Sequence, residues 1–113
     1  MAATLHFRQL SALRQTLVRL CQSINFGRIE DLETRSGEPV FSPTPRVLVS
    51  VDLGTDDGGR PEHDLGDFGL PKEMARLFDR LSELGHGTVA LIEVRAGLPR
   101  RIVIERHDPG VRR

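Results

Sequence analysis

The chain has 113 residues, of which 38% are hydrophobic and 28% are charged, and this is the size and composition of one globular domain. Sixteen basic and sixteen acidic residues give a formal net charge of zero, whereas a dedicated nucleic-acid-binding protein usually carries a strong basic excess. No apolar run is long enough to span a membrane, and the N-terminal segment lacks the pattern of a secretory signal. We therefore expect a single cytoplasmic domain over residues 1–113.

Cys21 is the single cysteine. It excludes an internal disulfide and a cysteine-based zinc site, and it favours a reducing compartment. We expect this residue to be small, apolar and buried. Fifteen of the sixteen basic residues are arginine, a bias typical of a GC-rich bacterial genome.

Two stretches of the sequence match without a gap when one is moved by sixty residues. The matched pairs are Gly27 with Gly87, Glu33 with Glu93, Arg35 with Arg95, Gly37 with Gly97 and Pro39 with Pro99. Glycines and a proline in register over such a run predict an internal duplication of one structural unit. We divide the chain into unit one at 5–52, an acidic glycine-rich loop at 53–70, unit two at 71–107 and a flexible tail at 108–113.

Unit one opens with a helix that carries a wide apolar surface. One stripe matches a helix of unit two and is formed by Leu17, Val18, Cys21 and Ile24. Asn25 then takes the position of a left-handed helix cap, a conformation that Asn tolerates.

A second stripe on this helix follows alternating spacings of three and four residues and consists of Leu10, Leu13, Leu17, Leu20 and Ile24. Unit two has Glu73 and Arg80 at the positions of Leu13 and Leu20. The first helix is therefore apolar over a wider arc than one sheet contact needs. We interpret the excess as a homodimer interface about a twofold axis, formed by Leu10, Leu13, Leu17 and Leu20. The alternative is that the N-terminal part of the helix covers only the core of its own chain.

A β-hairpin follows, with an outgoing strand over Gly27–Arg35 and a turn at Ser36-Gly37. Ile29 and Leu32 lie three residues apart, so both face the core only if a bulge interrupts the strand near Glu30-Asp31.

Two prolines interrupt the return strand of this hairpin. Val40-Phe41 precedes Pro43 and Pro45, and alternating valines follow at Val47, Val49 and Val51. Since proline cannot donate to a strand ladder, we expect a bulge or kink here and an edge position in the sheet.

The loop at 53–70 holds five glycines and five acids. One interpretation is a partner-docking loop that engages a basic surface through Asp56, Asp57, Glu62, Asp64 and Asp67. The alternatives are a solvated surface loop and a divalent-cation site that includes Asp52 and His63, although the spacing does not match the calcium-loop pattern.

Unit two begins with a helix predicted over Pro71–Leu84. Pro71 fits the first helical position and Gly85 fits a left-handed C-cap. The apolar stripe at helical spacing consists of Met74, Leu77, Phe78, Leu81 and Leu84.

The second hairpin joins an outgoing strand over Gly87–Arg95 to a return strand over Arg100–Arg106 through a turn at Ala96-Gly97. Four of its arginines are candidates for binding an anion or a nucleic acid, namely Arg95, Arg100, Arg101 and Arg106. The alternative is a ladder of surface charges, because the Glu-x-Arg pattern places both side chains on one strand face. The chain has no Tyr or Trp and five Phe, which leaves little material for stacking bases.

These elements predict an α+β fold built as a tandem α-β-β repeat. The simplest arrangement is a four-stranded, mainly antiparallel sheet with two helices packed on one face and a pseudo-twofold axis between the units. The other face of the sheet should be more polar.

The sequence Leu84-Gly-His-Gly-Thr-Val, the alternating strand, the glycine turn and the final Ile-Glu-Arg106 resemble the YezD-like family of very short bacterial proteins, over residues 74–106. Ala96-Gly97 departs from the Asp-Gly turn of that group. The resemblance implies a bacterial source and a unit that pairs with another copy of itself. It supplies no catalytic residue and no activity.

No nucleophile elbow, phosphate-binding glycine loop or zinc pattern is present in the sequence, and the four histidines are scattered. We therefore expect no catalytic residue, metal or cofactor. The favoured hypothesis is a non-enzymatic protein-interaction or adaptor module that forms a homodimer. The alternative is a nucleic-acid-binding accessory protein that uses the C-terminal arginines.

Overall fold

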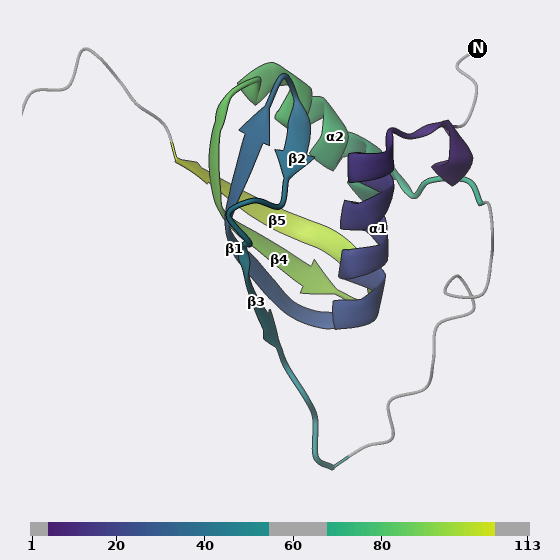
Figure 1. Ribbon diagram of the computed structural model, residues 1–113. Coiled ribbons are helices and arrows are strands. Elements are labelled where there is room, and N and C mark those ends of the chain that lie inside the picture. The colour runs from purple at the N-terminus through teal and green to yellow at the C-terminus, as the bar shows by residue number, and fades with distance from the viewer. Residues whose placement is uncertain (1–4, 55–67, 106–113) are drawn as a thin grey trace, which may run out of the picture.

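The computed structural model describes residues 5–54 and 68–105, which form two α-helices and one five-stranded sheet (Figure 1). In chain order the elements are the short 3-10 helix η1 (Phe7–Gln9), α1 (Ala12–Ile24), β1 (Phe26–Arg35), β2 (Glu38–Val40), β3 (Arg46–Val49), α2 (Lys72–Leu84), β4 (Gly87–Arg95) and β5 (Leu98–Glu105). The fold class is α+β, as predicted.

Every strand pairing in the sheet is antiparallel, and the order is β2-β1-β4-β5, with β3 also on β1. β2 pairs with the last residues of β1 and β3 pairs with Gly27–Glu30. The predicted interruption is confirmed, because the chain that holds Pro43 and Pro45 separates the two short strands. The predicted edge position is confirmed as well, because β2 and β3 each pair only with β1 among the described strands. The predicted count of four strands is wrong, since the valine segment after the prolines forms a strand of its own.

Equivalent elements recur sixty residues apart. Each α-helix has thirteen residues, and α1 begins and ends sixty residues before α2. In the central β1–β4 pair, Gly27 lies opposite Val94 and Thr34 lies opposite Gly87. Moving the first residue of each pair forward by sixty, and the second back by sixty, converts one pair into the other. This register is what a pseudo-twofold axis through the β1–β4 pair produces, while the duplication itself stays a prediction.

Both helices pack on one face of the sheet. Their apolar stripes and the inward side chains of β1 and β4 form a single buried cluster that includes Leu17, Val18, Cys21, Ile29, Leu32, Met74, Leu77, Phe78, Leu81, Val89 and Ile92. The opposite face carries ion pairs such as Arg28–Glu30 at 3.0 Å and Arg95–Glu93 at 3.3 Å. The sheet is therefore apolar under the helices and charged on its open side.

The predicted bulge in β1 is confirmed. Ile29 and Leu32 are both fully buried, and Asp31 between them has a positive φ of 59° and no partner in β4. The matching residues of β4, Val89 and Ile92, are also fully buried, and the register with β5 shifts between Val89 and Leu91. An extra residue in each strand lets two side chains that are three residues apart in the sequence face the same core.

Each α-helix ends at a residue with positive φ, as predicted. Asn25 has φ 62° and ψ −61°, and Gly85 has φ 68° and ψ −83°. These ψ values differ from the left-handed helical value that a left-handed cap requires, so that part of the prediction is wrong. The reason is that each cap carbonyl turns toward the hairpin of the other half, where Gly97 N–H donates to Asn25 O at 2.8 Å and Gly37 N–H donates to Gly85 O at 2.9 Å.

The helix starts differ from the prediction by short distances. Leu10 lies before α1, because the Ser11 hydroxyl accepts the Arg14 backbone N–H at 3.2 Å and so caps the helix. Pro71 is the N-cap of α2, which begins at Lys72 rather than at the proline. The return strand β5 begins at Leu98 instead of Arg100.

The end of the segment predicted as a surface loop belongs to the core. Leu70 is buried, and Phe68 stacks on Phe7 with ring centroids 5.1 Å apart. The backbone of this segment joins the N-terminal chain, since Phe7 N–H donates to Phe68 O at 2.9 Å and Leu70 N–H donates to Leu5 O at 2.8 Å. Residues 68–70 therefore anchor η1 beside the helices.

Candidate functional site

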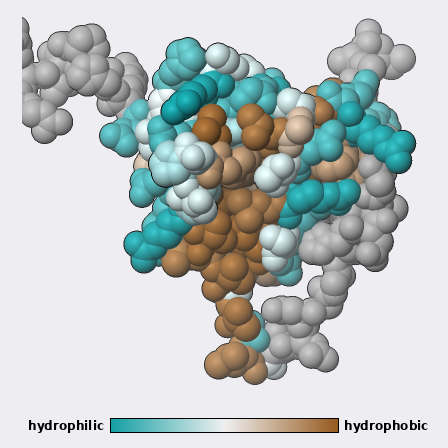
Figure 2. All heavy atoms as spheres, in the orientation of Figure 1, coloured by the Kyte–Doolittle hydropathy of each residue, from teal (hydrophilic) through white to brown (hydrophobic). Residues whose placement is uncertain are grey.

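One side of the molecule carries exposed and partly buried apolar side chains that we call the apolar edge. It is made by Leu13 and Leu20 of α1, Phe41 after β2, Val47 and Val49 of β3, and Val51 beyond β3. The exposed fraction rises along the valines, from 38% at Val47 to 54% at Val49 and 62% at Val51. Figure 2 shows hydrophobic atoms gathered over this side and continuing down to the end of β3.

The predicted dimer residues divide into two groups. Leu17 is fully buried and Leu10 is 7% exposed, so both belong to the core of their own chain and are not available to a partner. Leu13 is 41% exposed, and Leu20 is only partly buried against the core. Of the predicted interface, only Leu13 and Leu20 lie on the apolar edge.

The equivalent place in the second half has the opposite chemistry. Sixty residues after Leu13, Leu20, Val40 and Phe41 the chain has Glu73, Arg80, Arg100 and Arg101. Both sets lie where a helix passes over the outer strand of its own half, α1 over β2 and α2 over β5. The second half therefore has charged residues at these positions, whereas in the first half Leu20 and Phe41 pack partly against the core and Leu13 is exposed.

Sequence reasoning missed the three valines as part of an interaction surface. They alternate, which predicts a strand, but strand alternation usually means that one face is buried. The available signal was the expected edge position, because an edge strand with exposed apolar side chains invites pairing with another chain.

The charged counterpart of the apolar edge forms a groove of about 150 Å³ between α2 and β5, which we call the basic groove. It is lined by Glu73, Arg76, Leu77, Arg80, Pro99, Arg100, Arg101 and Ile102. Arg100 pairs with Glu73 at 2.9 Å and Arg80 pairs with Glu83 at 2.9 Å. Arg101 approaches Glu93 at 3.8 Å, so three of the four arginines face a carboxylate and Arg76 supplies the positive charge left over among the described residues.

The four predicted anion-binding arginines do not share one surface. Arg95 and Arg101 both approach Glu93 on the open face of the sheet, at 3.3 Å and 3.8 Å, and Arg101 also lines the basic groove together with Arg100. Arg100 is the extra residue of a bulge in β5 and turns toward α2 instead. Arg106 lies outside the described residues.

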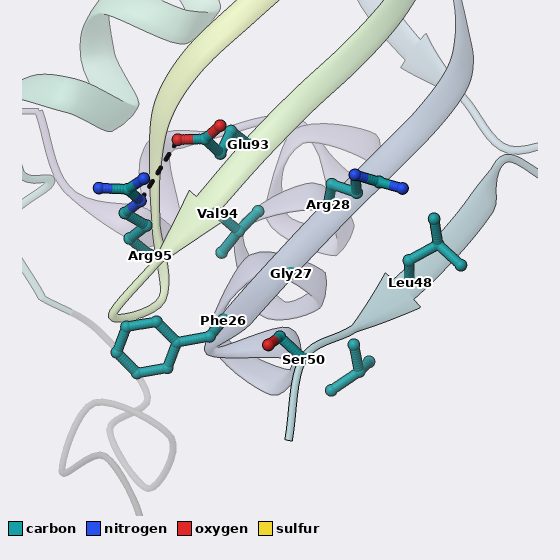
Figure 3. Close-up of a pocket in the computed structure, with 9 residues that line it drawn as sticks. Phe26, Gly27, Arg28, Leu48, Ser50, Glu93, Val94 and Arg95 are labelled. Carbon is teal, nitrogen blue, oxygen red and sulfur yellow. Dashed lines mark ion pairs between the residues drawn. The ribbon is translucent and has the colours of Figure 1, made fainter. Parts of the chain in front are cut away.

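A larger pocket of about 330 Å³ lies where β1, β3 and β4 meet at the end of the sheet. Figure 3 shows Phe26 and Arg28 on β1, Glu93 and Arg95 on β4 and Leu48 on β3 around it. Its two arginines are neutralised by ion pairs with neighbouring glutamates. The pocket therefore offers an apolar wall beside β3 and little net charge.

The titratable groups that are described do not assemble a catalytic centre. Burial raises the pKa of the Cys21 thiol to about 12, so this thiol stays protonated and unreactive. His86 uses Nδ1 to accept the Ser36 backbone N–H at 3.1 Å. Within residues 5–54 and 68–105, no three His, Cys, Asp or Glu side chains gather in a group that could hold a metal ion.

The proposed docking acids Asp56, Asp57, Glu62, Asp64 and Asp67 lie outside the described residues, as does the tail at 108–113. Their role stays a prediction. Among the described residues, neither α-helix is long and apolar enough to cross a membrane.

Comparison of the chain with protein-family models, curated proteins and solved structures finds no match. The resemblance to the YezD-like family stays a prediction, and the function has to be argued from the surfaces themselves.

Proposed function

We propose that the chain is a non-enzymatic, cytoplasmic protein-interaction module that self-associates through the apolar edge. The observation that carries this proposal is the contrast between the two halves. At equivalent places the first half has the exposed Leu13 and the partly buried Leu20 and Phe41, and the second half has glutamate and arginine. The exposed Val47, Val49 and Val51 extend the apolar side chains of the first half. A group of exposed apolar side chains on one side of a protein is best explained by a partner that covers it.

A second copy of the chain is the partner that explains the surface with the fewest assumptions. A twofold axis brings the same patch of two subunits together, so each apolar residue finds apolar residues opposite. The edge also includes β3, whose outer side has no strand partner within the described residues. Open edges of this kind are the usual route to strand pairing between chains.

Sedimentation velocity over a concentration series tests the proposal. The test variant combines Leu13→Glu with Leu20→Arg, which installs the residue types found at the matching positions of α2. We expect the wild-type chain to sediment as a dimer and the variant as a monomer with an unchanged far-UV circular dichroism spectrum. The control is Asp79→Arg, which changes the charge of an exposed position on α2 and should leave the dimer intact.

A monomeric wild-type chain at every concentration would contradict the proposal. So would a variant that keeps the dimer mass. A variant that loses its helical spectrum would instead assign Leu13 and Leu20 to the stability of the monomer, and Val49→Arg on β3 then serves as the second test of the edge.

A second candidate function is binding of an anion such as a nucleic acid backbone, and the basic groove is the observation that favours it. Arg76 lines the groove and forms no ion pair or hydrogen bond with the described residues, so among them its guanidinium is available to a phosphate. Gel shifts with single- and double-stranded DNA and RNA at low and moderate salt test this function. Binding should weaken steeply as salt rises and should be reduced in Arg76→Gln. Binding that Arg76→Gln leaves unchanged would place the nucleic acid elsewhere.

A further inference from the structure

We infer that two copies pair through β3 in an antiparallel register centred on Val49, which makes one continuous sheet across the dimer. This inference rests on the proposed self-association and specifies its geometry. It goes beyond an apolar contact because it fixes which residue of one chain lies opposite which residue of the other.

The backbone of β3 leaves every second residue free to pair outward. Ser50 N–H donates to Phe26 O at 2.7 Å, and the Leu48 carbonyl oxygen points at Gly27, where a Cβ would lie 2.1 Å from it. Backbone groups in an antiparallel strand alternate in direction, so Leu48 and Ser50 bond toward β1. The N–H and C=O groups of Val47, Val49 and Val51 therefore point away from β1.

The side chains around Val49 are self-complementary. In an antiparallel pair centred on Val49, Val47 lies opposite the partner's Val51, and Val49 lies opposite the partner's Val49. The outward N–H and C=O groups of Val47, Val49 and Val51 then form hydrogen bonds with those of the partner's Val51, Val49 and Val47. On the opposite face of the same strand, Arg46 lies opposite the partner's Asp52, and the twofold axis would form this ion pair twice. Within one chain Arg46 lies 3.8 Å from Glu30, and Asp52 accepts the Gly54 N–H at 2.8 Å, so the new ion pair would add to these contacts.

Neighbouring registers lose this match. Centring the pair on Leu48 places Arg46 opposite the partner's Ser50 and Val51 opposite the partner's Pro45, which has no N–H to donate. Centring it on Ser50 places Arg46 opposite the partner's Gly54. Only the register centred on Val49 pairs both charges and every exposed valine, so charge complementarity selects it.

The same geometry brings the helices into the interface. Val47 lies opposite Ile29 in the β1–β3 pair, and Ile29 faces the core beneath the helices. The valines are therefore on the helix side of the sheet. α1 lies over β2, at the same edge as β3, so two copies joined through β3 bring Leu13 and Leu20 of each α1 toward the junction.

Cysteine cross-linking tests the register. In the register centred on Val49, Val49→Cys places two thiols opposite each other on the twofold axis, at the Cα spacing of about 5.5 Å that a disulfide accepts. We expect this variant to form a covalent dimer under mild oxidation. The native Cys21 does not interfere, because it is buried and burial raises its pKa to about 12.

The matched controls are Val47→Cys and Val51→Cys, which lie on the same strand face. Each alone places its two thiols four residues apart along the paired strands, about 13 Å, which is too far for a disulfide. A mixture of the two variants should cross-link, because Val47 lies opposite the partner's Val51.

The outcomes separate the register from the proposed function. Covalent dimers of Val49→Cys and of the mixture support the register. A dimer in sedimentation that Val49→Cys does not cross-link, or that Val47→Cys alone cross-links, overturns the register and leaves self-association standing. A chain that sediments as a monomer overturns both.

Discussion

Gly27 and Gly87 match in sequence, but their surroundings make them unequal. A methyl group on Gly27 would lie 2.1 Å from the main-chain oxygen of Leu48, whereas on Gly87 it would lie 3.0 Å from the flexible end of Leu84. We expect Gly27→Ala to lower the free energy of unfolding by about 1–3 kcal/mol, because the backbone of β3 must move away. Gly87→Ala should cost less, since a side chain can rotate. Urea unfolding of both variants measures the difference, and equal losses would contradict the β1–β3 contact.

Cys21 provides a test of burial at a single atom. Its pKa is raised from 9.0 to about 12 by desolvation, so at pH 8 the folded chain holds almost no thiolate. Iodoacetamide should label the native protein very slowly and the unfolded protein quickly, because the thiolate is the reactive form. Rapid labelling of the native protein would show that the thiol is exposed.

The raised pKa of Cys21 also predicts how the free energy of unfolding depends on pH. Above pH 9 the thiol ionises in the unfolded chain before it ionises in the folded chain, which favours unfolding. The free energy of unfolding, relative to that of Cys21→Ala, should therefore fall as pH rises toward 12.

Arg14 ties three elements together at one end of the molecule. Its Nη2 donates to Gly37 O at 3.1 Å and to Ser82 Oγ at 2.9 Å, and its Nε forms an ion pair with Glu38 at 3.2 Å. The guanidinium thus joins α1 to the first hairpin and to α2. The matching residue of the second half is Met74, which is buried and apolar.

Arg14→Met should therefore destabilise the protein, although it copies the other half. Gly37 O and the Glu38 carboxylate lose a charged donor, at a cost of about 1–3 kcal/mol in the free energy of unfolding. Urea unfolding measures this, with Arg35→Met as the control at an exposed position that should change stability by less than about 0.5 kcal/mol. An unchanged midpoint for Arg14→Met would mean that these contacts do not stabilise the fold.

The elements that the sequence predicts well are those with a local cause. Helical spacing located both α-helices, and residues with positive φ at 36–37 and 96–97 confirm both hairpin turns. The bulge in β1 followed from the spacing of Ile29 and Leu32. β3 and the position of Arg100 depended on distant contacts, because the sequence does not show which strand the valines join or that a bulge turns Arg100 toward Glu73.

The candidate site was predicted in part for a related reason. The apolar width of α1 is visible in the sequence, and it identified Leu13 and Leu20. The same stripe also included Leu10 and Leu17, because helical spacing alone does not tell which side of a wide apolar arc meets the chain's own sheet. Burial in the folded chain separates the two groups.

At the scale of the whole molecule, pairing through β3 predicts which backbone amides become protected from hydrogen exchange when the dimer forms, and NMR can measure this residue by residue. The amides of Val47, Val49 and Val51 should exchange quickly in dilute solution and become protected as concentration rises, because dimer formation supplies their acceptors. Leu48 and Ser50 are internal controls, since their N–H groups bond toward β1 and should change less. Protection of the valine amides that does not depend on concentration would contradict pairing through β3.

The exchange of caps between the two halves has a consequence for synthesis on the ribosome. The Asn25 carbonyl accepts its hydrogen bond from the Gly97 N–H, and β1 has β4 as its central partner, so both contacts need residues that are synthesised late. In a nascent chain that ends before β4, the Asn25 carbonyl at the end of α1 therefore lacks its donor, and the side of β1 that pairs with β4 is unpaired. The stable fold should therefore form only after translation has passed residue 97. Until then the first half exposes its leucines and valines to chaperones and proteases.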